Sequence, residues 1–229
     1  ARYLRVPATW LIPQPPGLTP FEAMALGTAG FSAALAFHKL QAAGVTPDRG
    51  PVVVTGASGA VGSYAVSLLA SQLYHVVAVS SRPEHAAYLL GLGAAEVRTP
   101  GELALGDRPL GQGRFGGVID CVGGELLGRL LGHVRPGGSV VALGNAAGAE
   151  FRASVYPFIL RDVSLLGLSA THCPVETRLD LWRRLGGAWK PAHLDVVAGR
   201  VVTLDDVVAA AQDVYERRVR GRVVVDCTA

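Results

Sequence analysis

Three glycines stand at a regular spacing directly after a run of valines. In the stretch VVVTGASGAVGSYAV, residues 52–66, they are Gly56, Gly59 and Gly62. We expect a strand before them and a helix after them, the setting in which a glycine-rich loop binds the pyrophosphate of a dinucleotide. A side chain at Gly59 would keep a pyrophosphate from the backbone, and one at Gly62 would push the helix off the strand. A tight turn without a ligand is the alternative interpretation.

The residues that end the next expected strand favour one nicotinamide cofactor over the other. A site specific for NAD places Asp or Glu there, about 20 residues beyond the glycine loop, to bind the ribose 2′-hydroxyl. Here the strand HVVAVS ends in Ser80-Ser81-Arg82, with no acid. Two hydroxyl groups and a guanidinium suit a 2′-phosphate, because Arg donates charge-assisted hydrogen bonds. The sequence therefore predicts NADPH, with an ordinary polar turn as the alternative.

The positions of the lysines exclude a second class of enzymes whose glycine-rich loop is similar. The stretch TGASGAVG also fits the TGxxGxxG pattern of some short-chain dehydrogenases, which need a Tyr-x-x-x-Lys pair for proton transfer. The chain has two lysines, Lys39 and Lys190, and Leu35 and Gly186 stand four positions before them. The proton-transfer pair of that class is therefore missing.

The amino-acid composition excludes several further classes of protein. Apolar residues make up 50% of the 229 residues and charged ones 17%, which is typical of a compact globular protein. The net charge of +3 is too small for a nucleic-acid-binding surface. The longest uncharged stretch, Ala23–Phe37, is shorter than the ~20 residues that span a bilayer. The three cysteines form no C-x-x-C pair and the six histidines are scattered, so we expect no metal site. The same cysteine pattern fits a reducing compartment, and no signal peptide is recognised, so we expect a cytoplasmic protein.

Short apolar strands alternate with amphipathic helices across the middle of the chain. Runs that are apolar throughout, separated by helices, are typical of a parallel sheet covered on both faces. The sequence thus predicts an α/β fold with a Rossmann-type doubly wound parallel sheet. We expect strands over 52–55, 76–80, 96–98, 117–120, 139–143 and 163–168, and helices over 61–73, 84–92, 126–134 and 156–161.

The two ends of the chain follow other patterns. The first twenty residues hold five prolines, which is typical of an extended linker or edge strand. A helical stretch begins at Thr19, the expected N-cap, and the break Gly27–Gly30 divides it into two helices. Near the C-terminus we expect helices over 175–190 and 203–218 and a last strand, Arg222–Cys227.

Seven stretches of the chain carry a family resemblance, in the family's order: EAMALGTAGFSAAL, GPVVVTGASGAVGS, VVAVSSRPEHAAYLLGLGA, GGVIDCVGG, VRPGGSVVALG, PFILRDVSLLGL and GRVVV. With them the chain resembles a medium-chain dehydrogenase/reductase of the zinc-free quinone oxidoreductase group. Within that group, PFILRDV together with TGASGAVGS resembles the NADPH-dependent acryloyl-CoA reductase branch.

The resemblance implies roles for residues by position. No catalytic side chain is implied in this chain. The implied cofactor-binding residues are Ser58, Gly59, Ala60 and Val61 at the pyrophosphate; Ser80, Ser81 and Arg82 at the 2′-phosphate; Asn145 with Gly144, Ile159, and Ala170 with Ser169 beside the nicotinamide; and Arg222 and Ser32 near the cofactor.

The chain also departs from the family pattern. Where the family tends to carry Gly-x-Asp-Ser after the sixth strand, this chain has Gly167-Leu168-Ser169-Ala170, and an Arg sometimes found after the third strand is Pro100 here. Family members also carry a GroES-like catalytic domain. We expect residues 1–18 to be its closing strand and linker, 19–170 the NADPH-binding Rossmann domain, and 171–229 helices and a strand that pack back toward the catalytic domain. The chain, which does not begin with Met, is thus expected to be a fragment or a truncated form.

The resemblance implies reduction of a carbon–carbon double bond. The substrate expected first is an α,β-unsaturated acyl thioester such as acryloyl-CoA, and quinones or enones come second. A domain that binds NADPH without turnover, for example as a sensor, is the non-enzymatic alternative. Arg217, Arg218, Arg220 and Arg222 could contact the phosphates of coenzyme A, although such a charge run is usually solvated. The strand Val163–Ala170 is expected to pair with its copy in a homodimer, unless the chain's own C-terminal segments cover that edge.

Overall fold

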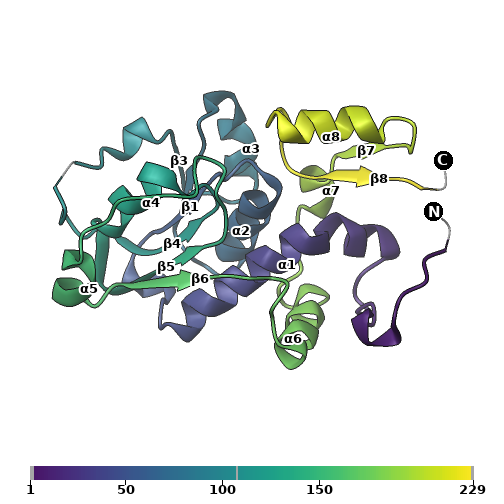
Figure 1. The fold of residues 1–229 in the computed structure, drawn as a ribbon, viewed down its shortest axis with the longest axis horizontal. Helices are drawn as coiled ribbons and strands as arrows, with labels where there is room; N and C mark the ends of the chain where they lie inside the picture. The colour runs from purple at the N-terminus through teal and green to yellow at the C-terminus, as the bar shows by residue number, and fades with distance from the viewer. Residues whose placement is uncertain (1–2, 107, 228–229) are drawn as a thin grey trace.

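The computed structural model describes residues 3–106 and 108–227, and its centre is a six-stranded parallel sheet (Figure 1). The strand order β3-β2-β1-β4-β5-β6 changes direction between β1 and β4, which confirms the predicted doubly wound topology. Val52 of β1 lies beside Val76 on one side and Gly117 on the other. The strands are β1 Val52–Thr55, β2 Val76–Val79, β3 Glu96–Arg98, β4 Phe115–Asp120, β5 Val134–Ala142 and β6 Ser164–Gly167.

The valines of β1 send side chains to both faces of the sheet. Val52 and Val54 belong to the hydrophobic cluster that includes residues of α1, α2 and α3, whereas Val53 belongs to the cluster that includes α4. Consecutive side chains of a strand point to opposite faces, so a strand that is apolar throughout needs helices on both sides. The helices that surround the sheet are α1 Pro20–Ala42, α2 Ala60–Ser71, α3 Ala86–Gly91, α4 Gly124–Leu131 and α5 Tyr156–Arg161.

Helix α1 begins as predicted but bends at a single residue. Thr19 Oγ1 accepts a hydrogen bond from the Glu22 amide at 3.2 Å, and the Glu22 carboxylate accepts one from the Thr19 amide at 2.8 Å. The expected break is present and lies at Gly27, whose φ of +44° is non-helical, so that two helical segments meet at a kink within Pro20–Ala42. Glycine takes this positive φ with little strain, so the chain can kink there between the two helical segments.

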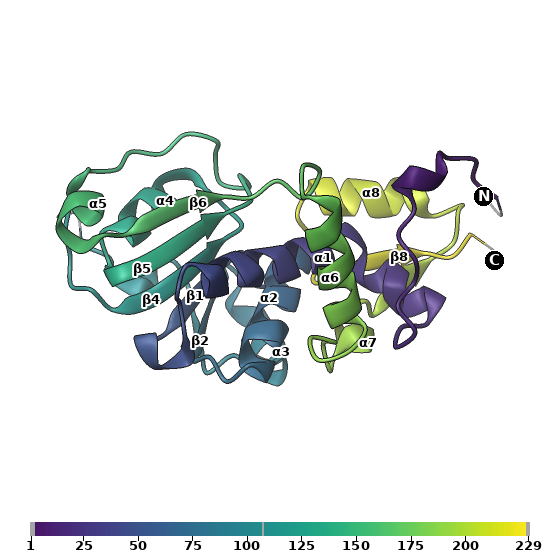
Figure 2. The same cartoon turned by 90° about the horizontal axis from the view of Figure 1, so that it is seen from below.

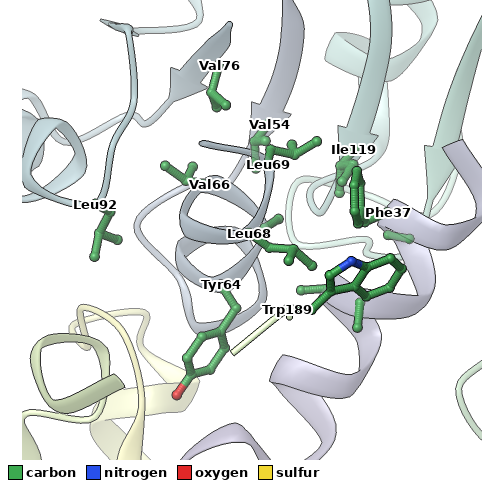
Figure 3. Packing of buried hydrophobic residues seen from close by; sticks show 14 of the residues in the cluster. Phe37, Val54, Tyr64, Val66, Leu68, Leu69, Val76, Leu92, Ile119 and Trp189 are labelled. Carbon is green, nitrogen blue, oxygen red and sulfur yellow. The ribbon is translucent and has the colours of Figure 1, made fainter. Parts of the chain in front are cut away.

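The last third of the chain packs against the same core. Trp189 lies 4.9 Å from Phe37 of α1 between ring centroids (Figure 3). Tyr64 of α2 is buried in the same hydrophobic cluster, and its hydroxyl donates to the Ala25 carbonyl at 2.8 Å. The polar atom of this large side chain is therefore satisfied inside the core.

The C-terminal elements form a layer of their own beside the main sheet. The helices predicted over 175–190 and 203–218 are present but shorter, and the last strand lies within the predicted range, Arg222–Cys227. Helix α7 and strand β7 were not predicted, and β7 pairs in parallel with β8, apart from the six-stranded sheet (Figures 1 and 2). The elements are α6 Val175–Leu185, α7 Leu194–Val197, β7 Arg200–Val202, α8 Val207–Tyr215 and β8 Val223–Val225.

The N-terminal segment was expected to hold the closing strand of a catalytic domain in residues 1–18, and that expectation stays a prediction. In its described part, residues 3–18, the segment has one 3-10 turn, Ala8–Trp10, and no strand. A strand exists through its ladder of hydrogen bonds, and the described part of the chain offers this segment no strand partner. The segment instead packs beside α6, where Pro15 lies against Gly186.

Candidate functional site

The carboxyl ends of β1 and β2 open into a cleft of about 720 Å³, and the glycine loop lines it. A Cβ placed on Gly62 would lie 2.6 Å from Ala57 Cα, so the close approach of α2 to the loop requires glycine there. A Cβ on Gly59 would meet only the Gly56 carbonyl oxygen, at 3.4 Å, which is an ordinary contact. Packing within the protein therefore does not explain glycine at Gly59, whereas close approach of a ligand does.

Helix α2 presents its amino end to this cleft. Gly59 is the N-cap residue, and no side chain of the described residues caps the helix. The amides of a first helical turn have no partner within the helix, and they carry a partial positive charge that attracts anions. Ser58, Gly59, Ala60 and Val61, the residues expected at a pyrophosphate, all line the cleft.

The end of β2 meets the glycine loop through two serines. Ser58 Oγ and Ser80 Oγ are hydrogen-bonded at 3.1 Å, and the Arg82 amide donates to Ser80 Oγ, also at 3.1 Å. Ser81 is exposed, and Ser80, Ser81 and Arg82 all line the same cleft as the loop. The structure thus brings together the two groups of residues on which the sequence-based prediction of NADPH rests.

A buried carboxylate, Asp120, precedes Cys121 and Val122 of the cleft lining, and sequence reasoning had assigned it no role. Asp120 at the end of β4 accepts hydrogen bonds from Thr55 Oγ1 at 2.6 Å and from the Gly123 amide at 2.8 Å. Burial raises the pKa of this carboxyl group, while the bonds from Thr55 and Gly123 act in the opposite direction. The Thr55–Asp120 pair ties β1 to β4 at the point where the sheet changes direction.

Cys121 lines the cleft but is not set up as a nucleophile. Burial is the main cause that raises the pKa of its thiol to about 12, and the neighbouring Asp120 charge adds to it. A thiol with such a pKa is protonated at neutral pH, and the thiolate is the reactive form. We therefore interpret Cys121 as a small packing residue.

The C-terminal segment forms part of the cleft, and no local signal in the sequence places it there. The Gly221 amide donates to the Ser58 carbonyl at 2.9 Å, and an Arg82 guanidinium nitrogen donates to the Arg217 carbonyl. Arg222, expected near the cofactor, lines the cleft, and its buried Nε has no hydrogen-bond partner among the described atoms. Such an orphaned donor fits a site made for an anionic ligand.

Three of the other predicted residues do not line this cleft. Asn145 follows β5 and is exposed next to Ala146, which does line it. Ala170 lines a second cleft of about 540 Å³, together with Met24 and Gly27. The Arg222 guanidinium stands between the two clefts, because it contacts the Met24 carbonyl at 3.5 Å. Ser32 is buried inside α1, only 8% exposed.

Ile159 is the predicted residue that the structure does not bring to the site. It lies on α5, 69% exposed, and α5 precedes β6 in the chain. The carboxyl ends of the parallel strands all lie at one end of the sheet. Helix α5 precedes the amino end of β6 in the chain, so it lies at the opposite end of the sheet. Figure 1 shows α5 at the end of the sheet away from α8. The expectation that Ile159 borders the nicotinamide therefore does not fit this chain.

Residues 3–106 and 108–227 contain neither a cluster of metal ligands nor a helix that could span a membrane. No group of three or more His, Cys, Asp or Glu side chains in this part could hold a metal ion. None of its helices is long and apolar enough to cross a membrane.

Comparison with known proteins gives a family match and similar full-length proteins. A family model described as zinc-binding dehydrogenase matches residues 60–185. The putative quinone oxidoreductase YhfP of Bacillus subtilis is 43% identical over 226 residues, which are 98% of this chain and 68% of YhfP. The acrylyl-CoA reductase AcuI of Ruegeria pomeroyi is 44% identical over 225 residues, again 98% of this chain and 68% of the relative.

Solved structures match as well. The crystal structure of Bacillus subtilis YhfP, with NAD bound, has a TM-score of 0.94 and covers 97% of this chain and 68% of its own. The structure of Escherichia coli K-12 YhdH, with bound NADPH, has a TM-score of 0.92 at 40% identity and covers 96% of this chain and 68% of its own.

Proposed function

This chain belongs to the zinc-binding dehydrogenase family, the medium-chain dehydrogenases and reductases, and on that premise we propose that it binds NADPH for the reduction of an α,β-unsaturated acyl thioester such as acryloyl-CoA. Membership of the family makes the chain part of an oxidoreductase. The observation that carries the choice of cofactor is the cleft itself, where Ser80, Ser81 and Arg82 stand beside the glycine loop and no acid follows β2.

The residues of the cleft fit this cofactor. When bound, NADPH supplies a hydride that is transferred to the β-carbon of the conjugated double bond. The glycine loop and the start of α2 would hold the pyrophosphate, and Ser80, Ser81 and Arg82 would hold the 2′-phosphate. The hydrogen bond between Thr55 and Asp120 fixes the loops that follow β1 and β4, so the walls of the cleft are set before a ligand binds.

The proposed substrate class rests on the resemblance and on named relatives. The AcuI of Ruegeria pomeroyi, called an acrylyl-CoA reductase, is 44% identical to this chain. A quinone or an enone is the second candidate, favoured by the name of YhfP at a nearly equal 43%. A non-catalytic NADPH-binding domain is the third, because none of the described residues has been identified as a catalytic side chain.

The ends of the chain belong to this proposal as well. We propose that residues 1–18 and 171–229 flank the Rossmann domain and pack toward a catalytic domain. Two observations support it. The β7–β8 pair is separate from the six-stranded sheet, and apolar residues of both segments are exposed, among them Trp10 at 73% and Tyr215 at 83%. The chain also spans 68% of the length of YhfP and AcuI, which leaves room for a further domain in the whole protein.

Steady-state kinetics of the purified full-length protein distinguishes the three candidates. NADPH oxidation would be followed at 340 nm with acryloyl-CoA, with 1,4-benzoquinone and without an acceptor. We expect a higher kcat/KM for acryloyl-CoA than for the quinone. The opposite order would favour the quinone, and NADPH binding by calorimetry without turnover of either acceptor would favour the non-catalytic domain.

A further inference from the structure

The structure sorts the arginines of the C-terminal charge run by what each side chain does. Arg218 forms ion pairs with Asp213, at 2.8 Å, and with Glu216. The Arg220 guanidinium stacks over the Tyr88 ring, 4.6 Å from its centroid. Neither Arg218 nor Arg220 lines the cofactor cleft, whereas Arg217 and Arg222 both do.

Arg217 combines a fixed backbone with a free side chain. Its φ of +59° is left-handed, which is uncommon for a residue other than glycine. Its carbonyl accepts a hydrogen bond from the Arg82 guanidinium, and the next amide, of Arg218, donates to the Asp213 carbonyl at 2.8 Å. The Arg217 guanidinium, in contrast, makes no hydrogen bond or ion pair with any residue that the structure describes.

The segment around Arg217 is also attached to the glycine loop. The amide of Gly221 donates to the Ser58 carbonyl at 2.9 Å, and that of Arg222 donates to the Val197 carbonyl at 2.7 Å. A Cβ on Gly221 would collide with the Val197 carbonyl oxygen, and the φ of +67° there also favours glycine. Arg217 is thus carried by a segment whose position against the cleft is fixed at both ends.

The charges that line the cleft are all of one sign. The charged residues among those described in its lining are Arg82, Arg217 and Arg222, and neither Asp nor Glu is present. The Arg222 guanidinium contacts the Met24 carbonyl, close to the kink of α1, whereas the Arg217 carbonyl accepts a hydrogen bond from the Arg82 guanidinium. The guanidinium groups of Arg82 and Arg217 and the exposed residue Ser81 line one cleft, and together they match a group with about two negative charges, such as a phosphate monoester.

We propose that Arg217 is a second cationic ligand of the NADPH 2′-phosphate, shared with Arg82. The preference for NADPH is then built jointly by the end of β2 and a C-terminal segment 135 residues further along the chain. This rests on the proposed cofactor and assigns a residue that the strand-end pattern alone does not reveal.

The test compares the Arg217→Gln variant with a matched control, Arg218→Gln, which removes a neighbouring guanidinium outside the cleft. Isothermal titration calorimetry would measure Kd for NADPH, NADH and adenosine 2′,5′-bisphosphate. In Arg217→Gln, we expect binding of NADPH and of the bisphosphate to weaken about ten- to hundredfold, with NADH changed less than about twofold. Arg218→Gln is expected to keep the wild-type ratio.

Further variants separate loss of the Arg217 charge from a loss of stability and test whether Arg82 and Arg217 bind the same phosphate. Arg217→Lys retains the charge and should recover part of the preference for NADPH, even if Arg217→Gln is less stable. Because Arg82 and Arg217 would bind one phosphate, the effects of Arg82→Gln and Arg217→Gln should not add in the double variant. An unchanged ratio of NADPH to NADH affinity in Arg217→Gln would overturn the proposal while leaving the cofactor in place. Equal affinities in the wild type would overturn both.

Discussion

Gly59 and Gly62 belong to one loop, yet each is glycine for its own physical reason. Gly62 is required by packing, because a Cβ there would lie 2.6 Å from Ala57 Cα. Gly59 has ordinary room for a Cβ on its protein side, so the proposed approach of the pyrophosphate, and not packing, accounts for glycine at this position. The two substitutions therefore separate the stability of the fold from the binding of the cofactor.

We expect Gly62→Ala to lower the free energy of unfolding by about 1–3 kcal/mol, the usual effect of overpacking. Gly59→Ala should leave that free energy within about 0.5 kcal/mol of the wild type but weaken NADPH binding at least ~tenfold. Urea denaturation and calorimetry would measure the two quantities. Wild-type binding by a folded Gly59→Ala variant would contradict the assignment of the loop to the pyrophosphate.

A second residue-scale prediction concerns pH. His133 at the amino end of β5 is buried, and its Nδ1 lies 3.0 Å from the Arg129 carbonyl. Burial is the main cause that lowers the pKa of its imidazole, and the charges of Arg114, Arg161 and Arg129 add to it, while the bond to the Arg129 carbonyl opposes them. The unfolded chain therefore binds the proton more readily below the ordinary value of 6.5.

The contribution of His133 to stability is present above pH 6.5 and is lost as the pH falls below it. We expect His133→Asn, whose amide can still donate to the Arg129 carbonyl, to lose less stability than the wild type between about pH 6.5 and pH 5. Urea unfolding at several pH values would measure this. Parallel pH profiles for the two proteins would show that His133 does not contribute.

At the scale of elements, the segment between α8 and β8 is as much a part of the cleft as the glycine loop. Gly221 holds it to Ser58, and its backbone leaves no space for a Cβ beside the Val197 carbonyl. We expect Gly221→Ala to displace the segment and weaken both NADPH and NADH by a similar factor, unlike Arg217→Gln. Calorimetry with both nucleotides would measure this, and a loss confined to NADPH would contradict it.

The elements show why sequence patterns predicted one half of the site directly, whereas in the other half only Arg222 was expected, and that through the family resemblance. The glycine loop and Ser80-Ser81-Arg82 are encoded locally, in residues next to strands that valine runs make recognisable. The contact between Gly221 and Ser58 joins residues far apart in the chain, and β7 is too short to give a periodic pattern. The implied role of Ile159 came from position in a family pattern, which carries no information about the edge of the sheet at which α5 lies.

At the scale of the whole molecule, β6 is an edge strand that pairs with β5 alone among the described strands. The chain's own C-terminal strands, β7 and β8, pair with each other and do not cover it. We propose that the strand Val163–Ala170 pairs with its copy in a homodimer, because an uncovered edge invites pairing with another chain.

A proline at Gly167 tests this dimer. Leu168 donates its amide to the Ala142 carbonyl of β5, so by alternation the Gly167 amide points away from the sheet. A Cβ on Gly167 would meet nothing within 4 Å. We expect Gly167→Pro to yield monomers and Gly167→Ala to keep the dimer, as measured by size-exclusion chromatography with light scattering. A wild-type monomer, or a dimer in Gly167→Pro, would contradict the proposal.

The most direct measurement is a calorimetric titration of the wild-type protein with NADPH and with NADH under matched conditions. The cleft, with its glycine loop, two serines and Arg82, predicts that NADPH binds at least ~tenfold more tightly, because the 2′-phosphate gains charge-assisted hydrogen bonds. Equal affinities for the two nucleotides, or tighter binding of NADH, would contradict the account of this site.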